Sequence, residues 1–143
     1  MDHLKSWINT LLHTIETEVD SDLGKRIIES CGKVCANDCG VLKEVNKLKN
    51  KMKDNKDVDL LINEMNKAGI AGGQLKREDN IIYGVYEKCY CPSRKDIDSP
   101  IYCNCTTGWA TAVFEIALER PVEVKLEKAI AWGDECCQFA VKY

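Results

Sequence analysis

The sequence has no apolar run that approaches the roughly 20 residues of a membrane-spanning helix. Its first twenty residues lack a basic leader, an unbroken apolar core and a small-residue cleavage site, so we recognise no signal peptide. It also lacks an excess of basic residues, because 20 Lys and Arg stand against 23 Asp and Glu. Nucleic-acid-binding proteins normally concentrate positive charge. We therefore expect a soluble, cytoplasmic protein with no membrane segment and no nucleic-acid partner.

Nine cysteines are the most unusual feature of the composition. In a secreted protein they would suggest a disulfide framework, but the number is odd and no export signal is present. In a reducing cytosol, thiols at short spacings more often bind metal or take part in chemistry. The cysteines are therefore the main candidates for function.

Apolar residues recur every three or four positions in the first half of the chain, the spacing of amphipathic helices. This spacing predicts helices over residues 4–19, 21–35, 41–52 and 58–65. We expect Asp20 or Ser21 to cap the second helix, Asp57 to cap the fourth, and Gly69 to end the fourth. Apolar residues expected along one side of the second helix are Leu23, Ile27, Ile28, Cys31 and Cys35.

The second half, from the Gly69–Gly73 segment onward, is rich in β-branched and aromatic residues. The predicted strands are residues 74–79, 81–90, 101–105, 122–132 and 137–143, with turns near Asn80 and at Gly133-Asp134-Glu135. Thr106 or Thr107 is expected to cap a helix that runs to Arg120 and is apolar on nearly all sides, hence buried.

This order of elements predicts one α+β domain over residues 1–143, with a helical half (1–69) and a strand-rich half (70–143). N-terminal helices would pack with a largely antiparallel sheet of about five strands. One buried helix would precede a C-terminal hairpin. A chain of 143 residues can bury a sufficient core without covalent cross-links.

Several short segments of the C-terminal half carry a resemblance to known proteins. They are Cys89-Tyr-Cys91, Tyr102-Cys-Asn-Cys105, Gly108-Trp109, Phe114-Glu115, Leu118-Glu-Arg-Pro-Val122, Gly133-Asp134 and Cys137-Gln-Phe139. Together they resemble the C-terminal half of the L-2-amino-thiazoline-4-carboxylic acid hydrolase-like family. More distantly, they are similar to 4-vinyl-reductase-type small-molecule-binding domains. The resemblance implies helices against an antiparallel sheet and a hydrolase that acts on a small sulfur-containing ring.

Cys89-x-Cys91 and Cys103-x-Cys105 form the sharper thiol pattern. Residues two apart on a strand point to the same face, about 6.6 Å apart. Two such pairs on neighbouring strands would present four sulfurs to one Zn²⁺ ion, with Zn–S distances near ~2.3 Å, or to an iron–sulfur cluster. The alternatives are four half-buried packing residues or a redox-active disulfide.

A second possible metal cluster consists of Cys31, Cys35 and Cys39, which are spaced four apart. On a continuous helix all three would share one face. Gly32, Asn37 and Gly40 weaken the expectation that the helix continues through them. The alternative is that Cys31 and Cys35 only extend the apolar side of the helix.

Catalytic residues are harder to identify. Cys136 is the freer thiol of the adjacent pair Cys136–Cys137, and Glu115 lies within the apolar helix as a candidate buried acid with a raised pKa. His3 and His13, the two histidines, are expected on the surface of the first helix.

Three functions follow from these observations. The first is a domain that binds a metal ion or small ligand through its clustered thiols. The second is a hydrolase that opens a thiazoline-like ring, which rests on the resemblance alone. The third is a partner-binding module in which the first helix forms the seam of a homodimer.

Overall fold

Four helices occupy the first half of the chain, as the sequence predicts. The computed structural model, which describes residues 3–88 and 94–143, contains α1 (His3–Glu18), α2 (Ser21–Asp38), α3 (Val41–Met52) and α4 (Val58–Lys67). Asp20 caps α2, because its carboxylate accepts a hydrogen bond from the backbone N–H of Leu23 at 3.3 Å. Asp57 caps α4 in the same way. Both capping predictions are confirmed.

The second half of the described chain forms an antiparallel sheet with helix α5 (Cys105–Leu118) between its two pairs of strands in the sequence. The strands are β1 (Leu75–Glu78), β2 (Ile81–Tyr86), β3 (Glu123–Lys128) and β4 (Cys137–Lys142), in the order β1-β2-β4-β3. The α+β class is therefore correct. The described residues form four strands rather than about five.

The segment 101–105, expected as a strand, is helical. Residues Pro100–Asn104 form the short 3-10 helix η3, which runs directly into α5 at Cys105. Pro100 stands in the first turn of η3, where its missing N–H costs no hydrogen bond and its fixed φ suits a helix. Asn104, rather than Thr106 or Thr107, therefore stands at the N-cap of the buried helix, which begins at Cys105 and ends at Leu118.

The strand expected over 122–132 ends early. Residues Ile130–Trp132 form the 3-10 helix η4, which ends at Gly133 with a φ of 97°. Asp134 holds this turn, because its carboxylate accepts a hydrogen bond from the backbone N–H of Ala129 at 2.9 Å. Ile130 and Trp132 alternate as they would in a strand, but Gly133 and Asp134, which follow them, favour a turn.

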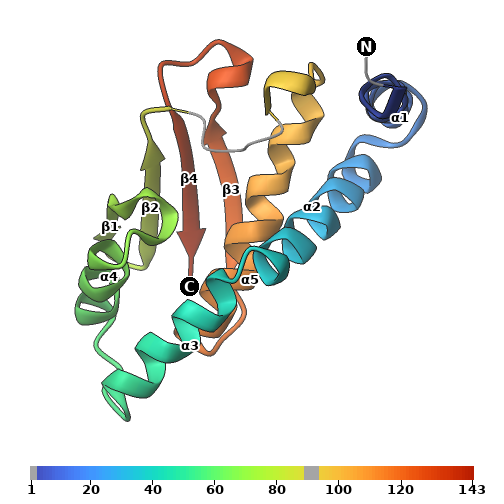
Figure 1. The fold of residues 1–143 in the computed structure, drawn as a ribbon. Coiled ribbons are helices and arrows are strands. Elements are labelled where there is room, and N and C mark those ends of the chain that lie inside the picture. The colour runs from blue at the N-terminus through green and yellow to red at the C-terminus, as the bar shows by residue number, and fades with distance from the viewer. Residues whose placement is uncertain (1–2, 89–93) are drawn as a thin grey trace.

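The main core lies between the sheet and α5, and α2 covers the other side of α5 (Figure 1). Phe114 of α5 and Phe139 of β4 are fully buried, with ring centroids 6.1 Å apart. The ring of Phe139 also covers Gly84 of β2, where an added Cβ would lie 2.2 Å from it. Glycine is therefore required opposite this phenylalanine.

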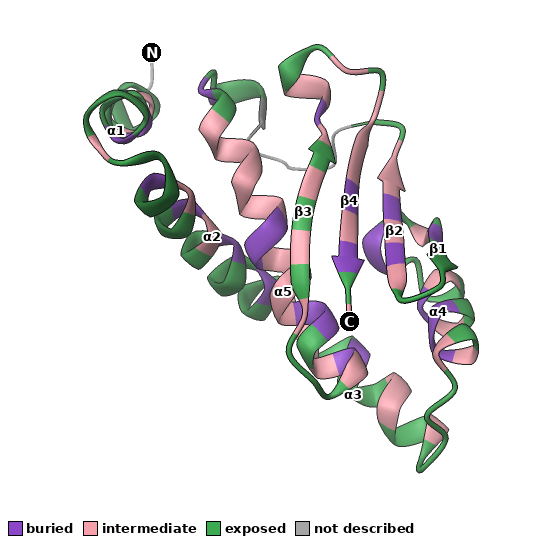
Figure 2. Ribbon diagram, turned by 180° about the vertical axis from the view of Figure 1, so that it is seen from behind, coloured by how far each residue is buried: buried purple, intermediate pink, exposed green. Residues whose placement is uncertain are grey.

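α2 and α5 cross with their backbones in contact. A Cβ added to Gly32 would lie 1.9 Å from the carbonyl oxygen of Cys105, and one added to Gly108 would lie 1.8 Å from that of Glu29. The buried residues of α2 lie four apart, at Gly24, Ile28, Gly32 and Ala36. Figure 2 shows buried positions along α2, with exposed positions beside them. The expected stripe is correct at Ile28, which is buried, but its other members, Leu23, Ile27, Cys31 and Cys35, stand one position before the buried residues and are exposed.

A smaller cluster attaches α1 to the rest of the molecule. Leu12 and Ile15 of α1 are buried with Ile28 of α2 and Ile97. Within the described residues, no helix has both the length and the apolar composition that crossing a membrane requires.

Candidate ligand-binding cleft

A cleft of about 340 Å³ lies where the end of α1, the start of α2, η3 and η4 meet. Its size falls in the range of small-molecule sites, which begins at roughly 300 Å³. Its lining consists of Ile15, Glu16, Val19, Ser21, Gly24, Lys25, Pro100, Ile101, Asn104 and Trp132. The lining thus combines aliphatic and aromatic side chains with one carboxylate, one ammonium, one amide and one hydroxyl.

The corner between α1 and α2 opens this cleft. Val19 and Asp20 alone separate α1 from α2, and the two helices point in different directions, since Figure 1 shows α1 end-on and α2 running obliquely across the view. Gly24 leaves room on the α2 wall, because a Cβ there would lie 3.2 Å from Ile15 Cγ2 and 3.4 Å from Ile101 Cδ1. Any larger side chain at position 24 would have to occupy the base of the cleft.

Polar contacts hold α1 against residues 96–99, which lead directly into η3. Asn9 donates from its amide to the carbonyl oxygen of Asp96 at 2.9 Å and accepts from the backbone N–H of Asp98 at 3.2 Å. His13 Nε2 lies 3.1 Å from the Asp98 carboxylate. Glu16 accepts a hydrogen bond from the buried Ser99 hydroxyl at 2.6 Å. These side chains order the segment that carries the η3 wall.

The polar groups of the cleft differ in how firmly they are held. The Trp132 indole N–H donates to the Pro100 carbonyl at 3.1 Å, which fixes the ring at the rim. Lys25 lies 3.8 Å from Glu29, a longer contact, and its side chain is 44% exposed. The Lys25 ammonium can therefore turn toward a bound molecule at little cost.

The structure describes only part of the sharper thiol pattern. Cys89 and Cys91 lie outside the described residues. Cys103 lies in η3 and Cys105 is the first residue of α5, and both are half-buried. The strand geometry expected for Cys103 and Cys105 is wrong, since residues two apart on a helix do not share a face.

Cys31, Cys35 and Cys39 lie on an unbroken helix and its C-cap, and all three are exposed. Gly32 therefore does not interrupt α2. Steps of four residues rise about 6 Å along a helix, so the outer two thiols are well separated. Among residues 3–88 and 94–143, no three His, Cys, Asp or Glu side chains are grouped to hold a metal ion.

The remaining candidates lie apart from the cleft lining. Glu115 is exposed, so the expectation of a buried acid is wrong. Cys136 is half-buried, and Cys137 Sγ accepts a hydrogen bond from the backbone N–H of Ile130 at 3.3 Å. His3 and His13 are both exposed, as predicted.

A family profile covers almost the whole chain. It is described as a family of unknown function, DUF6144, and it matches residues 1–142. The chain belongs to this family. No curated protein matches the sequence.

Two solved structures share the fold of this DUF6144 chain. One is the phenol-responsive sensory domain of the transcription activator PoxR, with phenol; the identity is 11%, the TM-score 0.58, and the match covers 96% of this chain and 73% of that one. The other is trafficking protein particle complex subunit 3 from Naegleria fowleri, covalently bound to palmitic acid; the identity is 12%, the TM-score 0.56, and the coverage 97% and 92%. At these identities the likeness shows the fold alone. Neither is a thiazoline hydrolase or a 4-vinyl reductase, so that resemblance is supported only in its fold class.

Sequence reasoning missed the cleft in this family member. Glu16, Lys25, Asn104 and Trp132 come from four elements, and none belongs to a recognisable motif. The available local signal was Asp20 directly after the first helix, which marks a sharp corner between two helices. A corner of this kind predicts a gap, but not which residues of the second half fill its other wall.

Proposed function

We propose that this DUF6144 chain is a binding domain for a small molecule that has an apolar body and a polar end. The observation that carries the proposal is the divided lining of the cleft. Ile15, Ile101 and Trp132 offer an apolar wall, and Lys25 offers a charge that is only loosely paired. Binding sites of this type combine a mostly apolar wall with a few polar groups that fix orientation.

The shared fold supports this proposal and suggests the class of ligand. PoxR's domain is described with phenol and the trafficking subunit with palmitic acid. Both molecules join a hydrocarbon body to an oxygen-bearing end. For this chain we infer a small aromatic hydroxy or carboxy compound, whose ring would lie against Ile101 and Trp132 and whose oxygen would meet Lys25.

Calorimetric titration with phenol, benzoate and toluene tests the proposal. Phenol or benzoate should bind more tightly than toluene, which lacks the polar end. Lys25→Met keeps the aliphatic stem and removes the charge, so it should weaken the polar ligands about tenfold to a hundredfold, as expected for a hydrogen bond to a charged group. It should leave toluene unchanged.

Lys33→Met is the matched control, because Lys33 is an exposed residue of the same helix outside the cleft. It should leave all three affinities unchanged. Equal weakening by both substitutions would place the binding elsewhere. No heat of binding for any of the three compounds would contradict the proposed ligand class.

A metal ion held by Cys103 and Cys105 together with Cys89 and Cys91 is the second part of this proposal. It draws on the two half-buried thiols at the start of α5 and on the chemistry of clustered thiolates. Zn²⁺ is the first choice and an iron–sulfur cluster the alternative. Elemental analysis of protein purified without added metal should find the metal in the wild type and in Cys31→Ser, but not in Cys103→Ser/Cys105→Ser. Metal-free wild-type protein with nine reactive thiols would contradict it.

The cytoplasmic location and the hydrolysis of a thiazoline-like ring remain predictions from the sequence. Pairing with a second copy of the chain is a separate proposal, because it depends on the exposed faces of α1 and α2 and not on the cleft.

A further inference from the structure

Exposed large hydrophobic residues are concentrated on the first two helices. Seven are found in the described part of the chain, and Trp132 is the one outside α1 and α2. The other six are Leu4, Trp7 and Leu11 of α1 and Leu23, Ile27 and Val34 of α2. Since single exposed hydrophobics are normal but groups are not, this concentration points to a covered surface.

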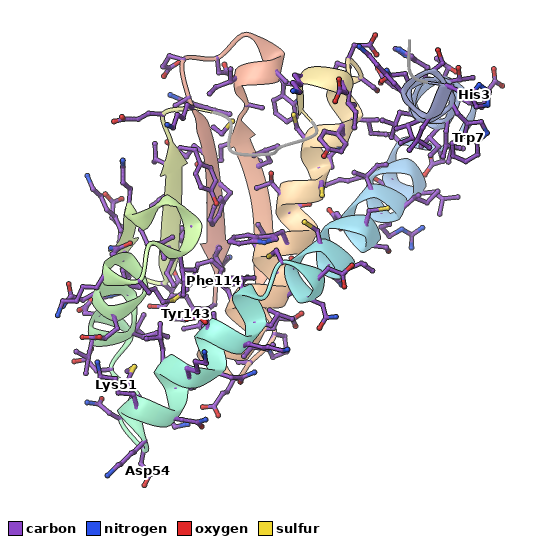
Figure 3. The ribbon with its side chains drawn as sticks, in the orientation of Figure 1. His3, Trp7, Lys51, Asp54, Phe114 and Tyr143 are labelled. Atoms are coloured by element: carbon purple, nitrogen blue, oxygen red, sulfur yellow. The ribbon has the colours of Figure 1, made fainter. Side chains whose placement is uncertain are left out.

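On α1, the exposed apolar residues lie beside the buried side of the helix. Leu4, Trp7 and Leu11 recur at steps of three and four residues, so they share one face. A shallow groove of about 460 Å³ runs along this part of the helix. Figure 3 shows Trp7 on the side of α1 that is turned away from the sheet.

On α2, the apolar arc is wider than its contact with α5 needs. The buried stripe Gly24, Ile28, Gly32 and Ala36 meets α1 and η3 through its first two residues and α5 at Gly32. Leu23, Ile27, Cys31 and Cys35 each stand one position earlier, about 100° around the helix. This second stripe, joined by Val34, is exposed. A helix that packed on one neighbour alone would carry polar residues there.

We propose that these two faces form a two-fold interface with a second copy of the chain. The lining of the α1 groove consists of His3, Ser6, Trp7, Thr10, Leu11 and Thr14, with neither a carboxylate nor a lysine or arginine. Each copy carries a net charge of −3, so two copies would approach each other with least repulsion through an uncharged face. A neutral apolar face is self-complementary across a two-fold axis, which is the commonest symmetry of soluble oligomers.

The exposed area is close to what a stable dimer needs. The six side chains are between 37% and 60% exposed. At about 100 Å² for each, they offer ~600 Å² of apolar surface per copy, against roughly 800 Å² in total per partner in a standard interface. The polar residues that flank them on the same two helices would supply the rim.

The mass in solution tests this inference, measured by sedimentation equilibrium over the micromolar range. The wild-type chain should be a dimer. Trp7→Glu and Val34→Glu each place a charge at a residue that is 58% or 60% exposed in one copy, so the fold should survive. Each should raise the dimer dissociation constant at least about a hundredfold, because the interface would bury an unpaired charge.

Lys33→Glu is the matched control, since Lys33 is exposed on α2 and lies outside the apolar stripe. It should leave the dimer intact. A monomeric wild type, or a dimer that survives both Trp7→Glu and Val34→Glu with helical content retained, would overturn the inference. Loss of the dimer in Lys33→Glu as well would show that net charge, and not this face, controls association.

Discussion

α2 contacts α5 and α1 in opposite ways. At α5 the contact is made by backbone, because Gly32 and Gly108 let the two helices touch with no side chain between them. At α1 it is made by side chains, where Ile28 packs with Leu12 and Ile15. The first contact admits one geometry, and the second can be repacked. The inner pair of helices therefore fixes the frame, while α1 is the element that can adjust around a ligand or a partner.

The difference also explains the exposed face of α2. The close contact with α5 is made at Gly32, without a large side chain, and the neighbouring apolar residues Leu23, Ile27 and Val34 are left exposed. A wider contact through large side chains would have covered more of them. The tightness of the inner contact thus leaves an outer face available for binding.

The largest loss of stability is expected when a side chain is added where the backbones of α2 and α5 touch. Gly32→Ala and Gly108→Ala would each place a Cβ less than 2 Å from a backbone oxygen, which no side-chain movement can relieve. Each should lower the free energy of unfolding by about 3 kcal/mol or more, at the upper end for overpacking. Denaturant unfolding followed by circular dichroism measures this loss.

Gly24→Ala is the matched control on the same buried stripe of α2. Its Cβ would lie 3.2 Å from Ile15 Cγ2 and 3.4 Å from Ile101 Cδ1, and the nearest backbone atom, the Ile15 carbonyl oxygen, would be at an ordinary contact distance of 3.7 Å. Since alanine favours a helix by up to about 1 kcal/mol over glycine, this variant should be neutral or slightly stabilising. If all three glycine variants lost equal stability, the backbone contact would not be what distinguishes the crossing.

A smaller effect is expected in the cluster that attaches α1. Leu12 in this cluster and Leu61 in the main core are almost equally buried, at 6% and 5% exposure. Leu61→Ala should cost about 3 kcal/mol, an ordinary value for a core leucine. Leu12→Ala should cost less, because α1 can detach locally while the rest of the fold persists.

Hydrogen exchange separates these two outcomes. Leu12→Ala should accelerate exchange mainly in residues 3–18, whereas Leu61→Ala should accelerate it across the whole core. Uniform acceleration in both variants would show that α1 and the core unfold together. The contrast between a fixed frame and an adjustable helix would then be wrong.

The contrast between local patterns and tertiary contacts also explains which features of the fold the sequence predicted correctly. Helix positions, the Asp20 and Asp57 caps and the α+β class follow from local periodicity and capping, so they were predictable. The role of Gly32 was not predictable, because a glycine within a helix lowers the helix propensity of the sequence. Its value for close packing is visible only when the partner helix is known. The one-position phase error on α2 has the same origin, since tertiary contact made the small residues the buried ones.

Local alternation also misled at two places in the second half. Ile101–Cys105 and Ile130–Trp132 alternate as strands do, yet Pro100 begins one short helix and Gly133 ends the other. The cleft could not be predicted, because its walls come from α1, α2, η3 and η4. The thiol pattern predicted metal binding but not where its cysteines lie in the fold. Two of its four cysteines lie outside the described residues.

The smallest effect on stability is expected after the C-terminal end of α5, where the contact is made by charged side chains and not by glycine backbones. Glu119 pairs with Lys56 and, at 2.9 Å, with Lys49. These hydrogen bonds, first from Lys56 and then from Lys49, lower the pKa of Glu119 from 4.5 to about 2. Because the pKa is lower in the folded protein, the stabilisation is complete above pH 4.5 and is lost as the pH falls toward 2.

Glu119→Gln isolates this charge, because both residues bear the same cost of the left-handed backbone at this position, where φ is 54°. The variant should melt slightly below the wild type at neutral pH, and the two melting temperatures should converge between pH 4.5 and 2. The gap should also shrink in high salt, since the carboxylate is half-exposed. In a Lys49→Met/Lys56→Met background, Glu119→Gln should have almost no effect. A gap that persisted there, or that was constant down to pH 2, would mean that position 119 acts through its backbone and not through its charge.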